Sequence, residues 1–313
     1  MTMNNSKKYS PKKIFIFASV SILIIVLSFL IYVDGFFGIS AKSVYSFFGI
    51  NEFSSNADDF PLSVHFIDVG CGDSILIKCG DRTALIDTGS FSLESKAQYY
   101  IKHSGVTKLD LFVATHTDSD HIGDFSSVAD NFEIDNIWLS NYCLDKKSDY
   151  TETEKAFFEK ISEKNINVIY PECKTYSFGS ADLQVLSPSK KYDDENDNSI
   201  VIKLTYKNVS YLFTGDSGEK AEEELLAEKA DLKSTVLKVS HHGSKSATSQ
   251  KFLNVVSPEY TVISAGDENK YLPNRQTVDR LKSSGAEILR TDRNGNIIVA
   301  TDGDNISVFC EKT

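Results

Sequence analysis

The sequence of 313 residues contains few cysteines, and their spacing argues against two common kinds of small structural site. The five cysteines lie at positions 71, 79, 143, 173 and 310, with no Cys-X-X-Cys pair among them. Such a pattern indicates neither a zinc knuckle nor a disulfide scaffold. A bridge between Cys143 and Cys173 is compatible with the sequence, but nothing in the pattern requires it.

Positive charge is also scarce, because 33 Lys and Arg face 44 Asp and Glu, for a net charge of −11. An acidic surface repels nucleic-acid backbones at long range. A nucleic-acid substrate would therefore have to be drawn in by bound metal ions or by a local basic patch. The hydrophobic fraction of 41% and charged fraction of 25% are typical of a globular protein with a full core, and they exclude a disordered chain.

Charge is absent altogether from residues 14–33, which at about 1.5 Å per residue span about 30 Å, the thickness of a bilayer's hydrocarbon core. Lysines precede this run and Asp34 follows it, which predicts a cytoplasmic N-terminus and an exported remainder. We expect a cytoplasmic basic tail (1–13), a transmembrane anchor (14–33) and a juxtamembrane linker (34–60). A cleaved signal peptide is the alternative, although its apolar region is usually about 7–15 residues. Both interpretations place the C-terminal domain outside the cell membrane.

The remaining residues, 61–313, alternate between predicted strands and helices without an internal linker. This pattern predicts one α/β domain with sheets inside and helices outside. Expected strands lie at 63–69, 74–78, 83–87, 109–115, 136–140, 167–170, 182–186, 235–240, 260–265 and 287–291, with hairpins over 199–214 and 296–311. Expected helices lie at 92–104, from about 123, and at 151–164, 219–229, 248–256 and 275–284.

Four groups capable of binding metal follow the apolar strand that ends near Ala114: His116, Asp118, Asp120 and His121. A strand-to-helix turn can point all four at one spot, and imidazole and carboxylate groups are ligands of divalent metals. Thr117, Asp118 and Asp120 are also residues that cap helix N-termini. Capping does not explain the two histidines that bracket them, so the stretch predicts a metal site.

Three other predicted strands end in a metal-binding residue beside a glycine turn. They are the strands that lead to Asp87 in Asp-Thr-Gly, to Asp216 in Thr-Gly-Asp, and to His241-His242 before Gly243. Each sequence alone is an ordinary turn. Together they are what loops gathered over one edge of a sheet sandwich would provide, with ligands held by rigid strands.

With these residues in this order, the chain resembles the metallo-β-lactamase superfamily, and within it the hydrolase domain of ComEC-type DNA-uptake proteins. The resemblance runs from about residue 63 to 302. It implies an αββα sandwich with a two-metal site at the shared edge of its sheets, and Zn²⁺ or Mn²⁺ as the ions. The matching stretches are Phe66–Ser74, Leu85–Gly89, His116–His121, Asn198–Val201, Leu212–Asp216, Leu237–Ser244 and Arg290-Thr291.

The resemblance also implies a role for each position. His116 and Asp118 resemble ligands of a first metal; Asp120, His121 and either His241 or His242 resemble ligands of a second; Asp216 resembles the bridging carboxylate, and Asp87 the residue that orients the ligand turn. The sequence does not decide between the two neighbouring histidines. The histidine that binds no metal would face the substrate.

Four positions depart from the superfamily's usual pattern. Asp118 replaces a histidine, as in the ComEC branch, and Asn198 lies where a further histidine is expected. The first metal site is thus poorer in nitrogen, which favours a harder ion such as Mn²⁺ or weaker occupancy. Cys71 stands where the branch commonly has Gln, and Leu272-Pro273 replaces a His-Pro pair. Since only one apolar span precedes the domain, we expect this chain not to translocate DNA itself.

The leading hypothesis is a metal-dependent phosphodiesterase or nuclease-like hydrolase anchored at the outer face of the cell membrane. Asp120 would orient a metal-activated water, and the spare histidine of the 241–242 pair would assist the leaving oxygen. A cell-envelope phosphodiester, such as a phosphorylcholine ester, is the alternative substrate to DNA. β-Lactam hydrolysis is least favoured, given Asp118. The third hypothesis is a non-catalytic surface binding protein. The sequence identifies no protein partner.

Overall fold

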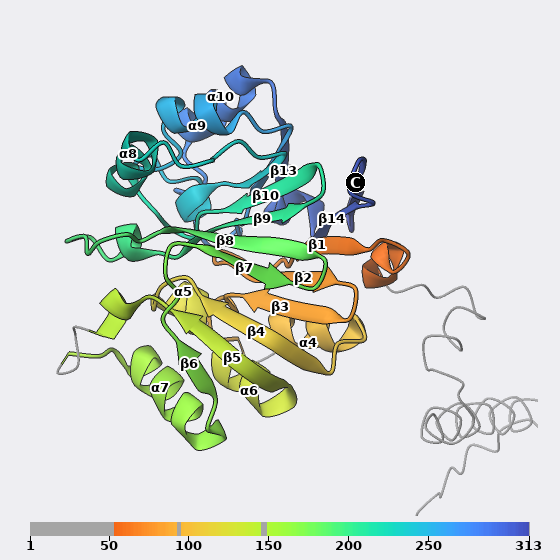
Figure 1. Ribbon diagram of the computed structural model, residues 1–313, viewed down its shortest axis with the longest axis vertical. Helices are drawn as coiled ribbons and strands as arrows, with labels where there is room; N and C mark the ends of the chain where they lie inside the picture. The colour runs from red at the N-terminus through yellow and green to blue at the C-terminus, as the bar shows by residue number, and fades with distance from the viewer. Residues whose placement is uncertain (1–52, 93–94, 145–148, 313) are drawn as a thin grey trace, which may run out of the picture. The chain divides into compact units, whose positions relative to one another are not determined.

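The computed structural model describes residues 53–92, 95–144 and 149–312 (Figure 1). The chain divides into two compact units, Met1–Glu52 and Phe53–Thr313, and every predicted site residue belongs to the second. The predicted tail and anchor lie outside the described residues and stay predictions. Within the described ranges, no helix is both long enough and apolar enough to cross a membrane.

One of the two sheets is built from eight strands in the order β15-β14-β1-β2-β3-β4-β5-β6. Its strands from β15 to β3 pair antiparallel, whereas β3 to β6 pair parallel. The bounds are β1 Leu62–Phe66, β2 Ile75–Cys79, β3 Arg82–Ile86, β4 Lys108–Ala114, β5 Glu133–Leu139, β6 Asn167–Ile169, β14 Ile297–Thr301 and β15 Ile306–Cys310.

The other sheet has seven strands in the order β13-β12-β11-β10-β9-β8-β7. It repeats the same division, with antiparallel pairing from β7 to β10 and parallel pairing from β10 to β13. The bounds are β7 Thr175–Phe178, β8 Ala181–Ser187, β9 Val201–Tyr206, β10 Val209–Phe213, β11 Val236–Lys238, β12 Tyr260–Ile263 and β13 Glu287–Arg290.

Three hydrophobic clusters show that the sheets pack face to face with helices outside. The largest lies between the sheets and joins side chains of both, such as Phe66 and Phe213. A second packs α4 Lys96–His103, α6 Phe125–Asn131 and α7 Glu152–Lys164 on the first sheet. A third packs α8 Glu219–Ala227, α9 Gln250–Val256 and α10 Arg275–Ser284 on the second sheet. The expected αββα sandwich is confirmed, with the helical layers at opposite ends of the view (Figure 1).

Short helical turns complete the described part: η1 Phe53–Ala57, α5 Ser119–Ile122, η2 Asn141–Leu144, η3 Asn196–Asn198, η4 Ser240–Gly243 and α11 Thr291–Asn294. The helix expected from about residue 123 is α6, which begins at Phe125, and the separate short helix α5 precedes it and contains Asp120 and His121. The hairpin predicted over 199–214 is confirmed; it turns at Lys207-Asn208, with Lys207 in the left-handed region (φ 52°). Strand β7 was not predicted, because it is a short edge strand of alternating exposure beside β8.

The parallel strands of both sheets end at the same side of the sandwich. β3 ends before Asp87 and β4 before Thr115, while β10 and β11 of the other sheet end before Asp216 and His241. Two backbone hydrogen bonds join these ends, from Ile200 N–H to Thr115 O (2.9 Å) and from His241 N–H to Gly215 O (3.1 Å). The sheets therefore carry all four predicted ligand segments to one edge.

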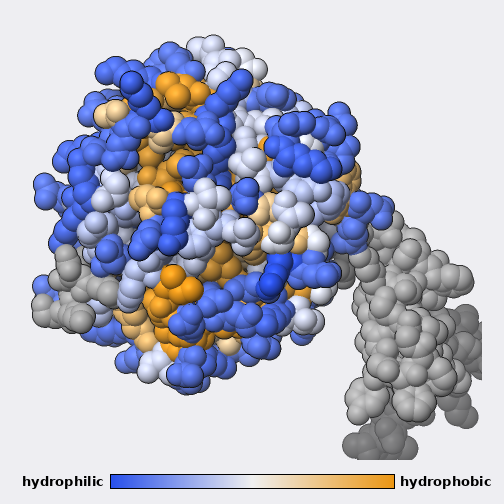
Figure 2. Space-filling view, in the orientation of Figure 1, coloured by the Kyte–Doolittle hydropathy of each residue, from blue (hydrophilic) through white to orange (hydrophobic). Residues whose placement is uncertain are grey.

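The cysteines form no bridge, since all five are free, with Cys143 buried and Cys173 exposed. A Cys143–Cys173 disulfide is therefore absent from this structure. Hydrophilic residues predominate on the face drawn in Figure 2, with hydrophobic areas between them.

A buried histidine outside the predicted site gives a test of the fold through pH. His65 on β1 lies fully buried, with its ring nitrogens 2.8 Å from Ser63 Oγ and 2.8 Å from the Tyr100 hydroxyl. Burial, together with the positive charge of Lys78, lowers the pKa of His65 from 6.5 to about 3. Below about pH 6.5 the unfolded chain therefore binds a proton at His65, whereas the folded chain does not until the pH falls to about 3. His65 therefore favours folding above about pH 6.5, and this contribution is lost as pH falls toward 3.

We predict that the His65→Gln variant loses less stability on acidification than the wild-type chain does. From about pH 7 to about pH 4.5 the difference should be about 2.5 kcal/mol, because each pKa unit corresponds to about 1.4 kcal/mol. Urea unfolding at both pH values measures it. Equal pH dependence in the two proteins would contradict a neutral, buried His65.

Candidate metal centre

Asp87 fixes the geometry of the turn that carries the candidate ligands from His116 to His121. It follows β3 with a left-handed backbone (φ 56°) and is fully buried. Its carboxylate accepts hydrogen bonds from Thr115 N–H (2.9 Å) and Thr115 Oγ1 (2.7 Å), and lies 2.7 Å from His121 Nδ1. Because Nδ1 of His121 is held by a carboxylate, Nε2 points the other way, which is how proteins orient metal-binding histidines.

The freed Nε2 of His121 faces Asp216 and His242. It lies 3.2 Å from Asp216 Oδ1 and 3.3 Å from His242 Nε2. The second oxygen of Asp216, Oδ2, lies 3.5 Å from His242 Nε2, and Asp120 Oδ2 lies 3.4 Å from the same nitrogen. Side chains from α5, from the turn after β10 and from η4 thus meet at one point.

His116 and Asp118 form the other end of the cluster. Nδ1 of His116 lies 3.1 Å from Thr115 Oγ1 and 3.4 Å from Ser199 Oγ, which leaves Nε2 facing Asp118 Oδ2 at 3.6 Å. Ligand atoms of His116, His121 and Asp216 lie within 4.8 Å of one another.

Helix capping does not account for the residues of this turn. Asp118 occupies the N-cap position of α5, yet its side chain makes no cap hydrogen bond. Thr117 Oγ1 instead donates to Glu154 of α7 (2.8 Å). The capping interpretation of these residues is therefore wrong, and the Asp118 carboxylate is left facing His116.

The two neighbouring histidines take different positions. His241 and His242 both have left-handed backbones (φ 49° and 52°), and Gly243 continues the turn with φ 79°. This unusual path buries His242 among the carboxylates. The side chain of His241 is 29% exposed, with Nε2 3.7 Å from Asp216 Oδ2. His242 thus sits inside the cluster, whereas His241 sits at its solvent side.

Sequence reasoning missed a buried ion pair behind His242. Asp73 Oδ2 lies 2.8 Å from Lys238 Nζ, both residues are almost fully buried, and Asp73 Oδ1 lies 3.6 Å from His242 Nδ1. In the sequence, the signal for this ion pair was Lys238, because a lysine is unusual in an apolar strand such as β11. Thr115 and Ser199 were missed as well, and short hydroxyl side chains carry no comparable signal.

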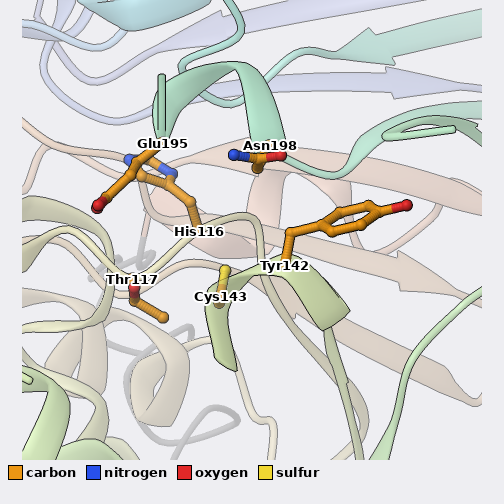
Figure 3. Close-up of a pocket in the computed structure, with 6 residues that line it drawn as sticks. All are labelled: His116, Thr117, Tyr142, Cys143, Glu195 and Asn198. Atoms are coloured by element: carbon orange, nitrogen blue, oxygen red, sulfur yellow. The ribbon is translucent and has the colours of Figure 1, made fainter. Parts of the chain in front are cut away.

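The side chain of Asn198 is held by its own loop and not by the candidate ligands. Its side-chain amide bonds the backbone of its own loop, donating to Tyr192 O and Asp194 O (both 3.0 Å) and accepting from Tyr192 N–H (2.9 Å). Together with His116 it lines a small cavity, whose other walls are Thr117, Tyr142, Cys143 and Glu195 (Figure 3). Asn198 therefore holds a loop beside the site. Pro273 of the Leu272-Pro273 pair packs on Gly243, next to the histidines.

The donor set fits divalent cations. Four buried polar atoms at this point have no hydrogen-bond partner among the described residues: Asp73 Oδ1, His116 Nε2, Asp216 Oδ1 and His242 Nδ1. Burial alone would lower the pKa of His242, but the charge of Asp216 and the contact with Asp120 raise it to about 9. The pKa of His121 is likewise raised despite burial, chiefly by Asp216 and Asp87. The carboxylates thus create a negative potential that bound cations would neutralise.

Comparisons with known proteins point to one protein family. A family model described as "Metallo-beta-lactamase superfamily" matches residues 67–267. The chain is 28% identical over 256 residues to ComE operon protein 3 of Bacillus subtilis (strain 168), covering 75% of this chain and 32% of that protein. It is 32% identical over 232 residues to competence protein ComA of Neisseria gonorrhoeae, covering 73% of this chain and 30% of that protein. The chain spans about a third of the length of these curated relatives.

Two solved structures share the fold. A mutant of the CmlA beta-hydroxylase aligns with a TM-score of 0.53 at 11% identity, over 88% of this chain and 59% of that one. The metallo-beta-lactamase fold protein YhfI from Bacillus subtilis aligns with a TM-score of 0.50 at 14% identity, over 77% and 99%. Because one of them is a hydroxylase, the fold alone does not assign hydrolysis.

We predict that Asp216→Asn lowers the divalent-metal content of the purified chain by about half or more, because in the expected two-metal site this carboxylate would serve both ions. Mass spectrometry of metal-replete protein measures it. Asp279→Asn is the matched control, since Asp279 is exposed and pairs only with exposed Arg275 among the described side chains. Full metal content in Asp216→Asn would contradict the predicted site.

We also predict that Asp73→Asn and Lys238→Met each destabilise the metal-free chain by about 3–5 kcal/mol, because each leaves a buried charge without its partner. The double variant should be more stable than either single variant. Urea unfolding in the presence of a chelator gives the three values. Simple additivity of the two losses would show that the pair is not coupled.

Proposed function

The chain belongs to the metallo-β-lactamase superfamily, and we propose that it is a metal-dependent hydrolase that cleaves phosphodiester bonds. The single observation that carries this proposal is the convergence of His116, Asp120, His121, Asp216 and His242 at one sheet edge. The curated relatives named above are competence proteins, which favours a nucleic-acid substrate. The uncharged run of residues 14–33 supports a membrane-anchored enzyme whose hydrolase domain lies outside the cell.

The geometry supports a division of the ligands between two ions. His116, Asp118 and His121 would hold one ion, and Asp120 and His242 the other. Asp216 suits the bridging role, because Oδ1 faces His121 while Oδ2 faces His242. This assignment moves His121 toward the first ion, next to His116, relative to the expectation drawn from the family resemblance. It also makes His242 the ligand of the histidine pair.

Bound divalent ions would supply Lewis-acid chemistry, activating a water molecule and stabilising negative charge at the attacked phosphorus and the leaving group. The chain's own residues then position the reactants. Asp120, at the open side of the cluster, would orient the attacking water and accept its proton. His241, held near Asp216 and partly exposed, would donate a proton to the leaving oxygen. Asp87 and Thr115 keep the His121 ring fixed throughout.

Two exposed aromatic residues, in loops that contact segments of the centre, would favour a substrate with unstacked bases. Phe91 is 68% exposed and lies two residues after Gly89, which forms a β-bridge with Ile122 next to the ligand His121. Tyr271 is 87% exposed, and its backbone N–H donates a hydrogen bond to the side chain of Asn269, whose Nδ2 contacts Cys71 Sγ. Aromatic platforms bind single strands by stacking, at about 1–3 kcal/mol per base.

A cell-envelope phosphodiester, such as a phosphorylcholine ester, is the second candidate substrate. The observation that favours it is the net charge of −11, which opposes a polyanion such as DNA. It requires the same metal centre and the same chemistry, so the two candidates differ only in what the rim of the site recognises.

We predict that the purified full-length chain, loaded with Mn²⁺ or Zn²⁺, hydrolyses single-stranded DNA and a chromogenic phosphodiester. Asp120→Asn should lower kcat at least about 100-fold on both, because it removes a positioned proton acceptor and a ligand. Asp279→Asn should retain wild-type rates. If the wild-type chain cleaves neither these nor a phosphorylcholine ester, the proposed function is wrong.

We further predict that Tyr271→Ala raises KM for single-stranded DNA about tenfold, because one stacking contact is lost. The KM for the small chromogenic diester should not change. Tyr99→Ala is the matched control, since Tyr99 is also exposed (61%) but stacks on His103 of its own helix α4. An equal loss on both substrates, or none on DNA, would remove the support for base stacking.

A further inference from the structure

We propose that Cys71 is a metal ligand, which makes one half of the centre a sulfur-containing site selective for zinc-like ions. The inference rests on the proposed metal centre and assigns a residue to it that the family's usual pattern does not provide. A set of three potential ligands from three separate segments carries it, rather than a cysteine alone.

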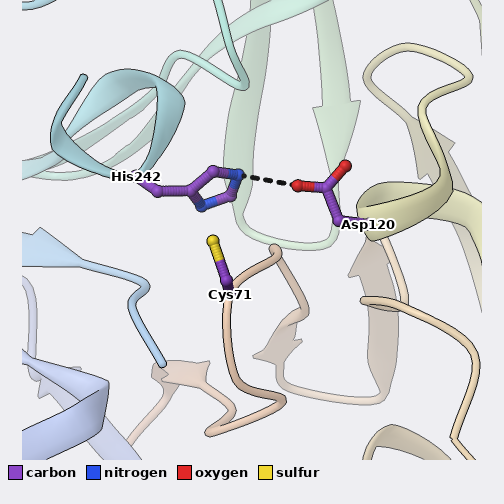
Figure 4. Close-up of side chains that lie close together, drawn as sticks. All are labelled: Cys71, Asp120 and His242. Carbon is purple, nitrogen blue, oxygen red and sulfur yellow. Dashed lines mark ion pairs between the residues drawn. The ribbon is translucent and has the colours of Figure 1, made fainter. Parts of the chain in front are cut away.

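The thiol lies among the ligands of the proposed second ion. Sγ of Cys71, a carboxylate oxygen of Asp120 and an imidazole nitrogen of His242 all lie within 4.8 Å of one another. In Figure 4, Cys71 projects from the β1–β2 loop toward His242, whose ring faces Asp120. His242 is almost fully buried, and its Nδ1 has no hydrogen-bond partner among the described residues.

The backbone around Cys71 is shaped to hold the thiol there. Gly70 (φ 91°) and Gly72 (φ 145°) flank it in conformations that favour glycine. A Cβ added at Gly72 would collide with the backbone oxygen of Asp120, so the loop packs directly on the ligand turn. The N–H of Cys71 donates to Glu268, and Asn269 Nδ2 donates to its Sγ (3.7 Å).

The surroundings of Cys71 suit a ligand and not a nucleophile. The half-buried Cys71 thiol lies in a negative environment formed by the carboxylates of Asp120, Glu268 and Asp216. Reactive cysteines lie in electropositive surroundings that favour the thiolate, and this site is the opposite. The same carboxylates attract a cation, and a bound cation reverses the local electrostatics and deprotonates a coordinating thiol. On binding, the S–H bond gives its proton to solvent as the sulfur–metal bond forms, without any change of oxidation state.

The resulting donor set is the one that Zn²⁺ prefers. Sulfur from Cys71, nitrogen from His242 and oxygen from Asp120, with the shared Asp216, give four ligands of the types found in tetrahedral zinc sites. Thiolate ligands disfavour Mn²⁺, whereas imidazole and carboxylate groups accept harder ions. The two halves of the centre therefore differ in their ligand atoms, because only one of them includes sulfur. The half formed by His116, His121 and Asp118 offers only nitrogen and oxygen ligands, which accept harder ions as well.

The test is cobalt substitution of the purified full-length chain, read by absorption spectroscopy. Wild-type protein should show a near-ultraviolet sulfur-to-cobalt charge-transfer band that grows with the occupancy of one ion. Cys71→Ser should lose this band while keeping the weaker visible bands of cobalt held by the other ligands. Cys173→Ser, which removes an exposed thiol outside the cluster, should leave the spectrum unchanged.

Metal competition supplies a second readout. Cys71→Ser should lower Zn²⁺ affinity at least about tenfold and Mn²⁺ affinity far less. Cobalt binding by the wild-type chain without the charge-transfer band would overturn the role of Cys71 and leave the metal centre intact. A chain that binds no cobalt at all would overturn both this inference and the proposed function.

Discussion

The structure of this site depends on burying several carboxylates at one sheet edge. Asp73, Asp87 and Asp216 are almost fully excluded from solvent, and an unpaired buried charge costs several kcal/mol. Lys238 neutralises Asp73, and the Asp87 carboxylate accepts two hydrogen bonds from Thr115. For Asp216 the described residues offer mainly histidines. The cluster is thus arranged around a charge that bound cations are best suited to balance.

Each half of the sandwich contributes to that balance in a different way. The first sheet supplies the ligand turn and, through Asp87, the orientation of His121. The second sheet supplies Asp216 and His242 and, behind them, Lys238, which pairs with Asp73 from the β1–β2 loop of the first sheet. An apolar cluster lies between the sheets, and the ligand segments lie where the strands end. The candidate ligands are thus held by the ends of strands whose other side chains pack in the core.

The sequence predicted the α/β domain and most of the residues that converge, whereas the αββα arrangement was implied by the family resemblance. Short apolar runs predicted most strands within a few residues, and the strand-end pattern singled out Asp87, Asp216 and the 241–242 pair. The choice between His241 and His242 could not be predicted, because it depends on left-handed backbone angles that two adjacent histidines do not signal. Asn198 was expected near a ligand position, but its amide bonds its own loop. Such details follow from tertiary packing, which no local pattern encodes.

Anomalous X-ray diffraction from crystals of the zinc-replete chain would test the central claim most directly. We predict two zinc peaks that share Asp216, one beside His116 and His121 and one beside Asp120 and His242, each about 2.0–2.3 Å from its ligand atoms. Zinc bound elsewhere, or a cluster whose imidazoles and Asp216 turn away from the ions, would contradict the account.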